Sequence, residues 1–345
     1  MRAYRVEQPG VAGLVDVPMP TPRAGEVLVR VEAVGICGSD LELLEGTRDA
    51  AYTRYPVVPG HEWAGVVAEA PEHPATSMLP PGTRVVVEGH HFCGVCGRCR
   101  EGRTQLCASY DEYGFTRDGG YREYVAARAD LCHPLRQADS SVGALSEPTA
   151  CALHAVERSR IGHADRVVVI GAGPIGLLAV ACAAACRPAR LVVADVRDST
   201  FAVARTLGAT GAVAAPASAL ADAVRDALGG SADVVIEAAG HPLAQVAATE
   251  LLARGGRLTV LGIAGSDRTT PFNFDPLVFR DARVEAVFAY PSAVFARAVA
   301  LIDTHVIDPA PLITHRFALS DAADALALLE SRREPAIKVL LDPRR

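Results

Sequence analysis

The spacing of hydrophobic positions changes along the chain and divides it into regions of two kinds. In the first third, short apolar runs alternate with turns rich in Gly and Pro, which is typical of β-strands. The strands predicted for this region cover residues 27–34, 64–70, 84–88 and 121–126. From about Glu147 onward, fully apolar runs alternate with segments of helical periodicity. Repeated strand–helix units of this kind predict a parallel sheet with helices on both faces.

The same spacing predicts the elements of the second region. Strands are expected at residues 166–170, 191–195, 233–238, 257–261 and 283–288, and helices at 174–186, 199–207 and 219–228. The tail returns to mixed spacing, with a helix at 321–330 and a strand at 337–341. We therefore expect an α/β protein. A doubly wound, nucleotide-binding domain at residues 147–289 is inserted into a β-rich domain made of residues 1–146 and 290–345.

One uncharged run, at residues 167–186, has the length to cross a bilayer. Four residues in its first half argue against one straight helix: Gly171, Gly173, Pro174 and Gly176. A buried strand, a tight turn and an Ala-rich helix explain the run better, so no membrane association is expected. The first ten residues lack the apolar segment of a secretory signal, and we expect a cytoplasmic protein.

Composition and charge exclude several classes of function. Half of the 345 residues are hydrophobic and 21% are charged, as in an ordinary globular protein of two domains. The net charge is −6 and the pI is about 5.9, so no general affinity for nucleic acid or anionic lipid is expected. Aromatic residues make up 5% of the chain, which leaves few rings to stack on bases.

Nine cysteines in a protein expected to be cytoplasmic indicate metal binding, because disulfides seldom persist there. Four of them follow one another at short spacing: Cys93, Cys96, Cys99 and Cys107. Four thiolates complete a tetrahedral zinc site with no open position, so this site is expected to be structural. A DNA-binding zinc ribbon is the rival interpretation. It is disfavoured because no recognition helix follows and the chain is acidic.

A glycine-rich turn predicts the cofactor. Residues 171–176 form a GxGxxG sequence that follows a predicted strand and opens a predicted helix, whose free N–H groups suit a pyrophosphate. Asp195 ends the next strand and is placed to bind a ribose diol; its charge opposes the 2′-phosphate of NADP, although Arg197 would weaken that preference. We expect NAD, bound by Gly171, Gly173, Pro174, Ile175, Gly176, Asp195, Arg197, Gly240 and Gly262.

A second set of possible metal ligands is dispersed along the chain: Cys37, His61, Glu62 and Glu147. A thiolate, an imidazole and a carboxylate suit zinc, and a mixed set with an exchangeable position is what catalysis requires. Each residue alone is ambiguous, since a lone Cys37 could be a buried apolar residue and Glu147-Pro148 could be a helix start. Their order relative to the four cysteines and the glycine turn favours a catalytic zinc.

The chain resembles the medium-chain, zinc-containing alcohol dehydrogenases from end to end. The matching pieces are Cys37-Gly38-Ser39-Asp40, Gly60-His61-Glu62-Trp63-Ala64-Gly65, the four cysteines, Asp118-Gly119-Gly120-Tyr121, Glu147-Pro148 and the glycine turn. Within that family it is most similar to the polyol (sorbitol- or arabinitol-type) and aminocyclitol dehydrogenases. The resemblance implies a GroES-like catalytic domain and two zinc ions per chain, one catalytic and one structural.

The resemblance also implies roles for single residues. Cys37, His61 and a carboxylate hold the catalytic zinc, with Glu62 and Glu147 competing for the last place. Ser39 is expected to relay the proton of the alcohol. Many relatives carry a histidine five residues after the zinc cysteine, whereas this chain has Glu42. The second step of the relay therefore falls to Glu42 or to the cofactor ribose.

The expected function is hydride transfer from a secondary alcohol, namely a polyol, sugar or aminocyclitol hydroxyl, to NAD. A threonine-type amino-alcohol dehydrogenase or an aldehyde reductase is the alternative among enzymes. A catalytically dead protein that binds NAD and zinc is the alternative outside them, and the retained Cys37, His61 and Glu62 speak against it.

The final predicted strand, residues 283–288, is apolar in character and would invite pairing if left bare. The resemblance implies that two such edges meet across a twofold axis, which gives a homodimer or a homotetramer. The alternative is an edge covered by the chain's own residues 272–277.

Overall fold

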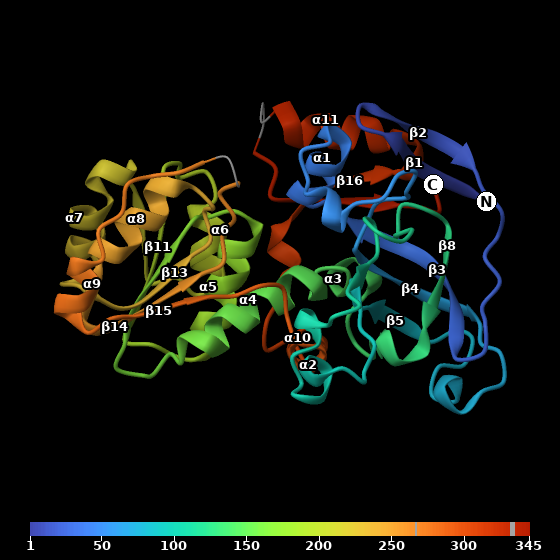
Figure 1. The fold of residues 1–345 in the computed structure, drawn as a ribbon, viewed down its shortest axis with the longest axis horizontal. Coiled ribbons are helices and arrows are strands. Elements are labelled where there is room, and N and C mark those ends of the chain that lie inside the picture. The colour runs from blue at the N-terminus through green and yellow to red at the C-terminus, as the bar shows by residue number, and fades with distance from the viewer. Residues whose placement is uncertain (266–267, 332–334) are drawn as a thin grey trace. The chain divides into compact units, whose positions relative to one another are not determined.

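A six-stranded parallel sheet forms the centre of one half of the fold (Figure 1), in a computed structural model that describes residues 1–265, 268–331 and 335–345. Its strands are β10 (Arg166–Ile170), β11 (Arg190–Asp195), β12 (Gly211–Ala214), β13 (Ala232–Glu237), β14 (Leu252–Val260) and β15 (Arg283–Ala286). They lie in the order β12-β11-β10-β13-β14-β15. Counted within the sheet this is 3-2-1-4-5-6, the order of doubly wound dinucleotide-binding domains. The predicted fold class is confirmed.

Helices on both faces of this sheet explain why its central strands β10, β11 and β13 are mostly apolar and buried. The helices are α5 (Pro174–Ala185), α6 (Phe201–Thr206), α7 (Ala217–Leu228), α8 (Pro242–Glu250) and α9 (Asp275–Arg280). The α7 helix places Leu220, Val224 and Leu228 at helical spacing, and all three are buried against the sheet. A strand covered on both faces has no polar side, so its sequence is a continuous apolar run.

A seven-stranded, mostly antiparallel sheet forms the other half. Its order is β16-β17-β3-β4-β5-β9, and β8 also pairs with β3. The bounds are β3 (Glu26–Gly35), β4 (Glu62–Glu69), β5 (Arg84–Val87), β8 (Tyr124–Arg128), β9 (Cys132–Pro134), β16 (Ile313–Ala318) and β17 (Lys338–Asp342). Two hairpins accompany it, β1 (Arg2–Gln8) with β2 (Val11–Asp16) and β6 (His90–His91) with β7 (Asp111–Glu112). The strand β17 brings the end of the chain beside β3.

Further helices lie in the rest of the chain. They are α1 (Gly38–Glu45), α2 (Gly97–Arg100), α3 (Ser140–Gly143), α4 (Ser146–Ser159), α10 (Ser292–Asp303) and α11 (Ala322–Ser331). Short 3₁₀ turns lie at Ala50–Tyr52, Pro74–Thr76, Thr104–Leu106, Ala129–Leu131, Ala310–Leu312 and Leu319–Asp321. Among the described residues, no helix has the length and apolar character needed to cross a membrane.

Contacts divide the chain into two units. Unit 1 consists of Met1–Glu147, Pro291–Val306 and Ile313–Arg345, and unit 2 of Pro148–Tyr290 and Ile307–Leu312. Glu147 thus belongs to unit 1, and a short segment after α10 returns to unit 2.

A carboxylate at the end of α10 helps to hold this helix against the rest of unit 1. Asp303, the last residue of α10, accepts N–H bonds from Arg136, Gln137 and Ala138 on Oδ1, at 2.9, 2.8 and 3.0 Å. Burial alone would raise the pKa of Asp303, but these three donors hold it below its usual range.

Candidate metal centre and dinucleotide site

Three side chains from two adjacent strands meet in unit 1. Cys37 follows the end of β3 and caps the start of α1, while His61 and Glu62 stand at the start of β4. Because Gly35 of β3 pairs with Glu62 of β4, the two strand ends lie side by side. A Sγ of Cys37, a ring nitrogen of His61 and a carboxylate oxygen of Glu62 all lie within 4.8 Å of one another. The structure thus brings together three of the four ligands predicted for the catalytic zinc.

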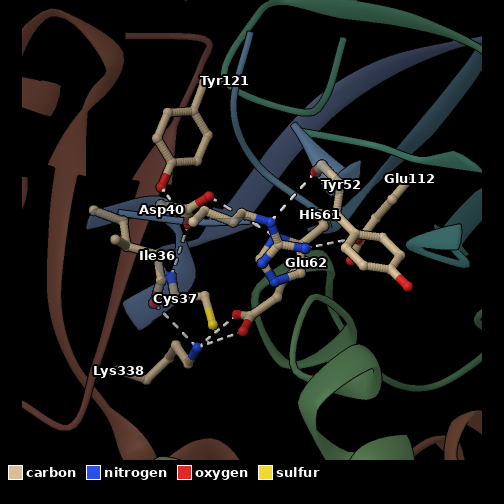
Figure 2. A network of polar contacts seen from close by, with 10 residues as sticks. Ile36, Cys37, Asp40, Tyr52, His61, Glu62, Glu112, Tyr121 and Lys338 are labelled. Carbon is tan, nitrogen blue, oxygen red and sulfur yellow. Dashed lines mark hydrogen bonds and ion pairs between the residues drawn. The ribbon is translucent and has the colours of Figure 1, made fainter. Parts of the chain in front are cut away.

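Asp40 contacts two residues of this cluster. Its Oδ2 accepts the N–H of Cys37 at 2.9 Å and the hydroxyl of Tyr121 at 3.1 Å, and its Oδ1 lies 3.8 Å from Nδ1 of His61 (Figure 2). A carboxylate behind a histidine fixes the orientation of a metal-binding ring. Burial lowers the pKa of His61, but Cys37, Asp40 and Glu147 outweigh it and leave the pKa well above its ordinary value. The same negative surroundings suit a bound cation.

Glu62 has a second, cationic partner. The Nζ of Lys338, on β17, lies 2.8 Å from Oε1 and 2.6 Å from Oε2 of Glu62, and 3.1 Å from the carbonyl oxygen of Ile36. Figure 2 shows the ammonium group and the carboxylate facing each other, with the sulfur of Cys37 beside them. Both side chains are almost fully buried, at 3% and 1% exposure. Burial lowers the pKa of Lys338, but Glu62 and Cys37 outweigh it, so the net shift is upward.

Glu147, the fourth predicted ligand, lies in the first turn of α4 and interacts electrostatically with His61 and Glu62. Burial raises its pKa to about 7, with His61 opposing the rise and Glu62 adding to it. Glu112, which the sequence did not single out, is a further, partly buried carboxylate that interacts electrostatically with His61, and its Oε2 lies 3.0 Å from Nη2 of Arg48. Carboxylates therefore surround His61 on more than one side.

The residues predicted for the proton relay lie on one helix. Ser39 is partly buried in the first turn of α1, and Glu42 is exposed one turn later. Residues three apart on a helix are neighbours on its surface. The structure places both on α1, directly after Cys37.

The four cysteines form a compact second cluster. Their sulfur atoms lie within 4.8 Å of one another. Backbone N–H groups point at the sulfurs, with Cys96 N 3.3 Å from Cys93 Sγ and Cys93 N 3.2 Å from Cys107 Sγ. Bonds from the N–H groups of Ala108 and Cys99 lower the pKa of Cys96 to about 6. A set of four close thiols, with N–H groups that stabilise thiolates, fits a closed tetrahedral zinc site.

The glycine turn has the geometry that a dinucleotide needs. Gly171 has φ +99°, and a β-carbon at Gly176 would collide with the carbonyl oxygen of Gly171, so both positions need glycine for the fold itself. At Gly173 a β-carbon would meet nothing within 4 Å. Helix α5 begins at Pro174 without a side-chain cap, so the first N–H groups are available to an anion.

Asp195 stands beside this turn at the end of β11. Its Oδ2 accepts the N–H of Ala172 at 2.8 Å and its Oδ1 that of Arg197 at 3.0 Å. Gly240 and Gly262 approach each other at the ends of β13 and β14, where a β-carbon at Gly262 would collide with the backbone of Gly240. All the predicted cofactor residues thus lie at the carboxyl ends of the parallel strands, where such sheets bind ligands.

Asp40 and Lys338 contact the candidate metal ligands, and the sequence analysis gave neither of them a role. Asp40 stood only as part of the motif Cys37-Gly38-Ser39-Asp40, and Lys338 lies 276 positions from its partner Glu62. A signal for Lys338 was present in the composition, because it is the only lysine in the sequence, beside 33 arginines. A signal for Asp40 was its place three residues after the capping Cys37, where an acidic side chain caps a helix start.

Two family models match the chain. Residues 23–137 match the alcohol dehydrogenase GroES-like domain, and residues 174–304 match the zinc-binding dehydrogenase model.

Curated relatives match over nearly the whole length. An erythritol/L-threitol dehydrogenase of Mycolicibacterium smegmatis is 33% identical and covers 99% of this chain and 98% of its own. An L-threonine 3-dehydrogenase of Streptomyces coelicolor is 33% identical, over 97% of this chain and 96% of its own. Among solved structures, a protein of Sinorhizobium meliloti described as a zinc-binding dehydrogenase, with NADP bound, has a TM-score of 0.90 at 33% identity and covers 99% of both chains.

Proposed function

Because this chain belongs to the zinc-containing alcohol dehydrogenase family, we propose that it transfers a hydride from a secondary hydroxyl of a polyol, sugar or aminocyclitol to NAD, giving a ketone. It is an oxidoreductase that acts on CH–OH groups. The observation that carries the proposal is the cluster of Cys37, His61 and Glu62 within 4.8 Å, in a chain that also has a complete dinucleotide turn.

The donor sets fit two zinc ions with different tasks. The four cysteines form a closed site, so we assign them the structural ion. Cys37, His61 and Glu62, with Glu147 close by, form a mixed site with room for an exchangeable ligand, which suits a catalytic ion. When bound, this zinc supplies a Lewis acid for the alcohol oxygen, and the nicotinamide accepts the hydride.

The chain's own residues handle the proton and hold the site in shape. We propose that the Ser39 hydroxyl relays the proton of the alcohol, receiving that proton while it gives up its own hydroxyl proton, since it follows Cys37 by two residues on α1. Glu42, one turn further and exposed, is placed to pass that proton to solvent. Asp40 accepts the N–H of Cys37 and its other oxygen lies 3.8 Å from Nδ1 of His61, so we propose that it fixes the positions of both ligands.

We propose NAD rather than NADP as the working cofactor. The carboxylate of Asp195 lies beside the turn that receives the pyrophosphate, where it can accept bonds from the ribose hydroxyls and repel a 2′-phosphate. Similar solved structures contain either NADP or NADH. The proposed preference for NAD therefore rests on the charge of Asp195.

A panel of substrates tests the activity. NADH formation at 340 nm is followed with erythritol, threitol, altritol, sorbitol, an aminocyclitol and L-threonine. We expect the highest kcat/KM with one of the polyhydroxylated substrates. Threonine as the best substrate would favour the amino-alcohol alternative, which the threonine dehydrogenase relative keeps open. No reduction of NAD or NADP by any of them would contradict the proposal.

We further propose that the enzyme is a homodimer, or a homotetramer built from such dimers, and works in the cytoplasm. Strand β15 is last in its sheet order, and Val284 and Phe288 are 46% and 48% exposed. Pairing of two such edges across a twofold axis would cover both.

A cytoplasmic location agrees with cysteines used as metal ligands, because thiols stay reduced there.

A further inference from the structure

The only lysine of the chain is buried at the candidate catalytic centre. Every other basic side chain apart from histidine is one of 33 arginines, so the composition strongly favours arginine wherever a cation is needed. Lys338 departs from that preference at a position where the side chain is 3% exposed. A fully buried lysine is rare unless it is paired.

The pairing of Lys338 uses all of its hydrogen-bonding capacity. An ammonium group has three donors, and here they face Glu62 Oε1, Glu62 Oε2 and the carbonyl oxygen of Ile36. A guanidinium group is larger, planar and carries five donors. An arginine in this closed space would leave donors without partners, which explains why lysine stands here.

Three neighbouring strands build this contact. Lys338 opens β17, β17 pairs with β3 through Leu340 and Gly35, and Gly35 pairs with Glu62 of β4. A β-carbon at Gly35 would collide with Oε2 of Glu62, so the glycine leaves room for the Glu62 carboxylate beside Lys338. In this position the Glu62 carboxylate lies within 4.8 Å of the ligand atoms of Cys37 and His61.

We propose that Lys338 is a positioning residue for the catalytic metal, because its ammonium group fixes the Glu62 carboxylate at the place where Glu62 joins Cys37 and His61 as a ligand. The inference rests on the proposed function, since it takes Cys37, His61 and Glu62 as the catalytic metal site. Lys338 also offsets the negative charge of Glu62 when no metal is bound. Outer partners of this kind raise metal affinity by about 10- to 100-fold.

Metal binding by variants tests the proposal. Lys338→Met removes the ammonium and keeps a long side chain, Lys338→Arg keeps the charge, and Leu341→Ala is the control, because it weakens the same buried strand without touching Glu62. Zinc content and competition with a chromogenic chelator are measured on each folded protein. We expect two zinc ions in the wild type, and about 10- to 100-fold weaker binding of one of them in Lys338→Met.

The other variants separate positioning from general stability. Lys338→Arg is expected to lose affinity for the same ion, whereas Leu341→Ala lowers the melting temperature but keeps both ions at wild-type affinity. Wild-type affinity for both ions in a folded Lys338→Met protein would overturn the proposal. So would an equal loss of affinity in Leu341→Ala.

An NMR experiment tests the same proposal without a substitution at Lys338. With lysine labelled by ¹⁵N at Nζ, the protein gives a single side-chain ammonium resonance, because it has one lysine. Zinc added to metal-depleted wild type is expected to shift this resonance, and Cys37→Ser is expected to abolish the shift. An unmoved resonance while the second zinc binds would contradict the proposal. A wild type that binds one zinc and reduces no cofactor would instead refute the proposed function.

Discussion

Single residues divide into those that the fold needs and those that only a ligand needs. Gly171 and Gly176 are required by the backbone itself, whereas Gly173 faces open space and has φ −78°. Asp40 and Lys338 act on the metal ligands through direct contacts, and neither was assigned a role from the sequence. Spacing in the sequence identifies a ligand set, but the partners behind it come from other strands and are visible only after folding.

The difference between the three glycines gives a direct prediction. Gly173→Val is expected to fold with a melting temperature close to wild type, because a β-carbon at this position meets no protein atom within 4 Å. It should weaken NADH binding at least about 100-fold, since the open space that a β-carbon enters at Gly173 is where a pyrophosphate would fit. Quenching of intrinsic fluorescence by NADH measures the affinity. Tight NADH binding in this variant would place the pyrophosphate elsewhere.

The charge at Asp195 is expected to set the choice between NAD and NADP. Asp195→Asn keeps an acceptor for the N–H of Ala172 but removes the charge that opposes a 2′-phosphate. The ratio of kcat/KM for NAD over NADP should fall about tenfold or more, which corresponds to about 1.4 kcal/mol. Asp198→Asn, an exposed neighbour, is the control for net charge. An unchanged ratio in Asp195→Asn would leave the choice to other loop residues.

At the scale of elements, the sequence predicted long apolar strands well and several helices poorly. The continuous apolar runs of β10, β11 and β13 were predicted as buried strands. Helices cover both faces of the sheet at these strands, which explains why the runs have no polar side. The helices α4, α8 and α10 were not predicted. In α10 the signal was present, because its buried residues Val294, Ala298 and Ile302 repeat at helical spacing. The N-terminal hairpin was also missed, and the strand expected at residues 121–126 is found at Tyr124–Arg128.

The ionised Asp303 contributes to the attachment of α10 within unit 1. A carboxyl with a lowered pKa stabilises the fold above its unfolded-state pKa of about 3.9, and that contribution disappears as the pH falls through the folded value. Asp303→Asn should therefore lower the free energy of unfolding by about 2 kcal/mol near pH 7, and by less below pH 4. Urea denaturation at both pH values measures the difference, with exposed Asp324→Asn as control. An equal loss at both pH values would show that the charge of Asp303 is not the stabilising feature.

For the whole molecule, assembly is expected to depend on the free edge of the parallel sheet. Phe274, Val278 and Phe279, on and beside α9, are 68%, 73% and 81% exposed and add apolar surface near β15. Val284→Lys should shift the protein from dimer to monomer in light scattering at micromolar concentration, because it places a charge on the edge strand. A dimer unaffected by this substitution would locate the interface elsewhere, and a monomeric wild type would exclude the pairing of edges.

The two candidate zinc sites carry the central claim, because the proposed activity requires the mixed site and the four cysteines form the closed one. The most direct test determines zinc per chain together with NADH formation, in the wild type and in Cys37→Ser. The wild type should contain two zinc ions and reduce NAD with a polyhydroxylated alcohol. Cys37→Ser should keep one ion, held by the four cysteines, and lose the activity. Cys37→Ser with two ions and wild-type turnover would contradict the account.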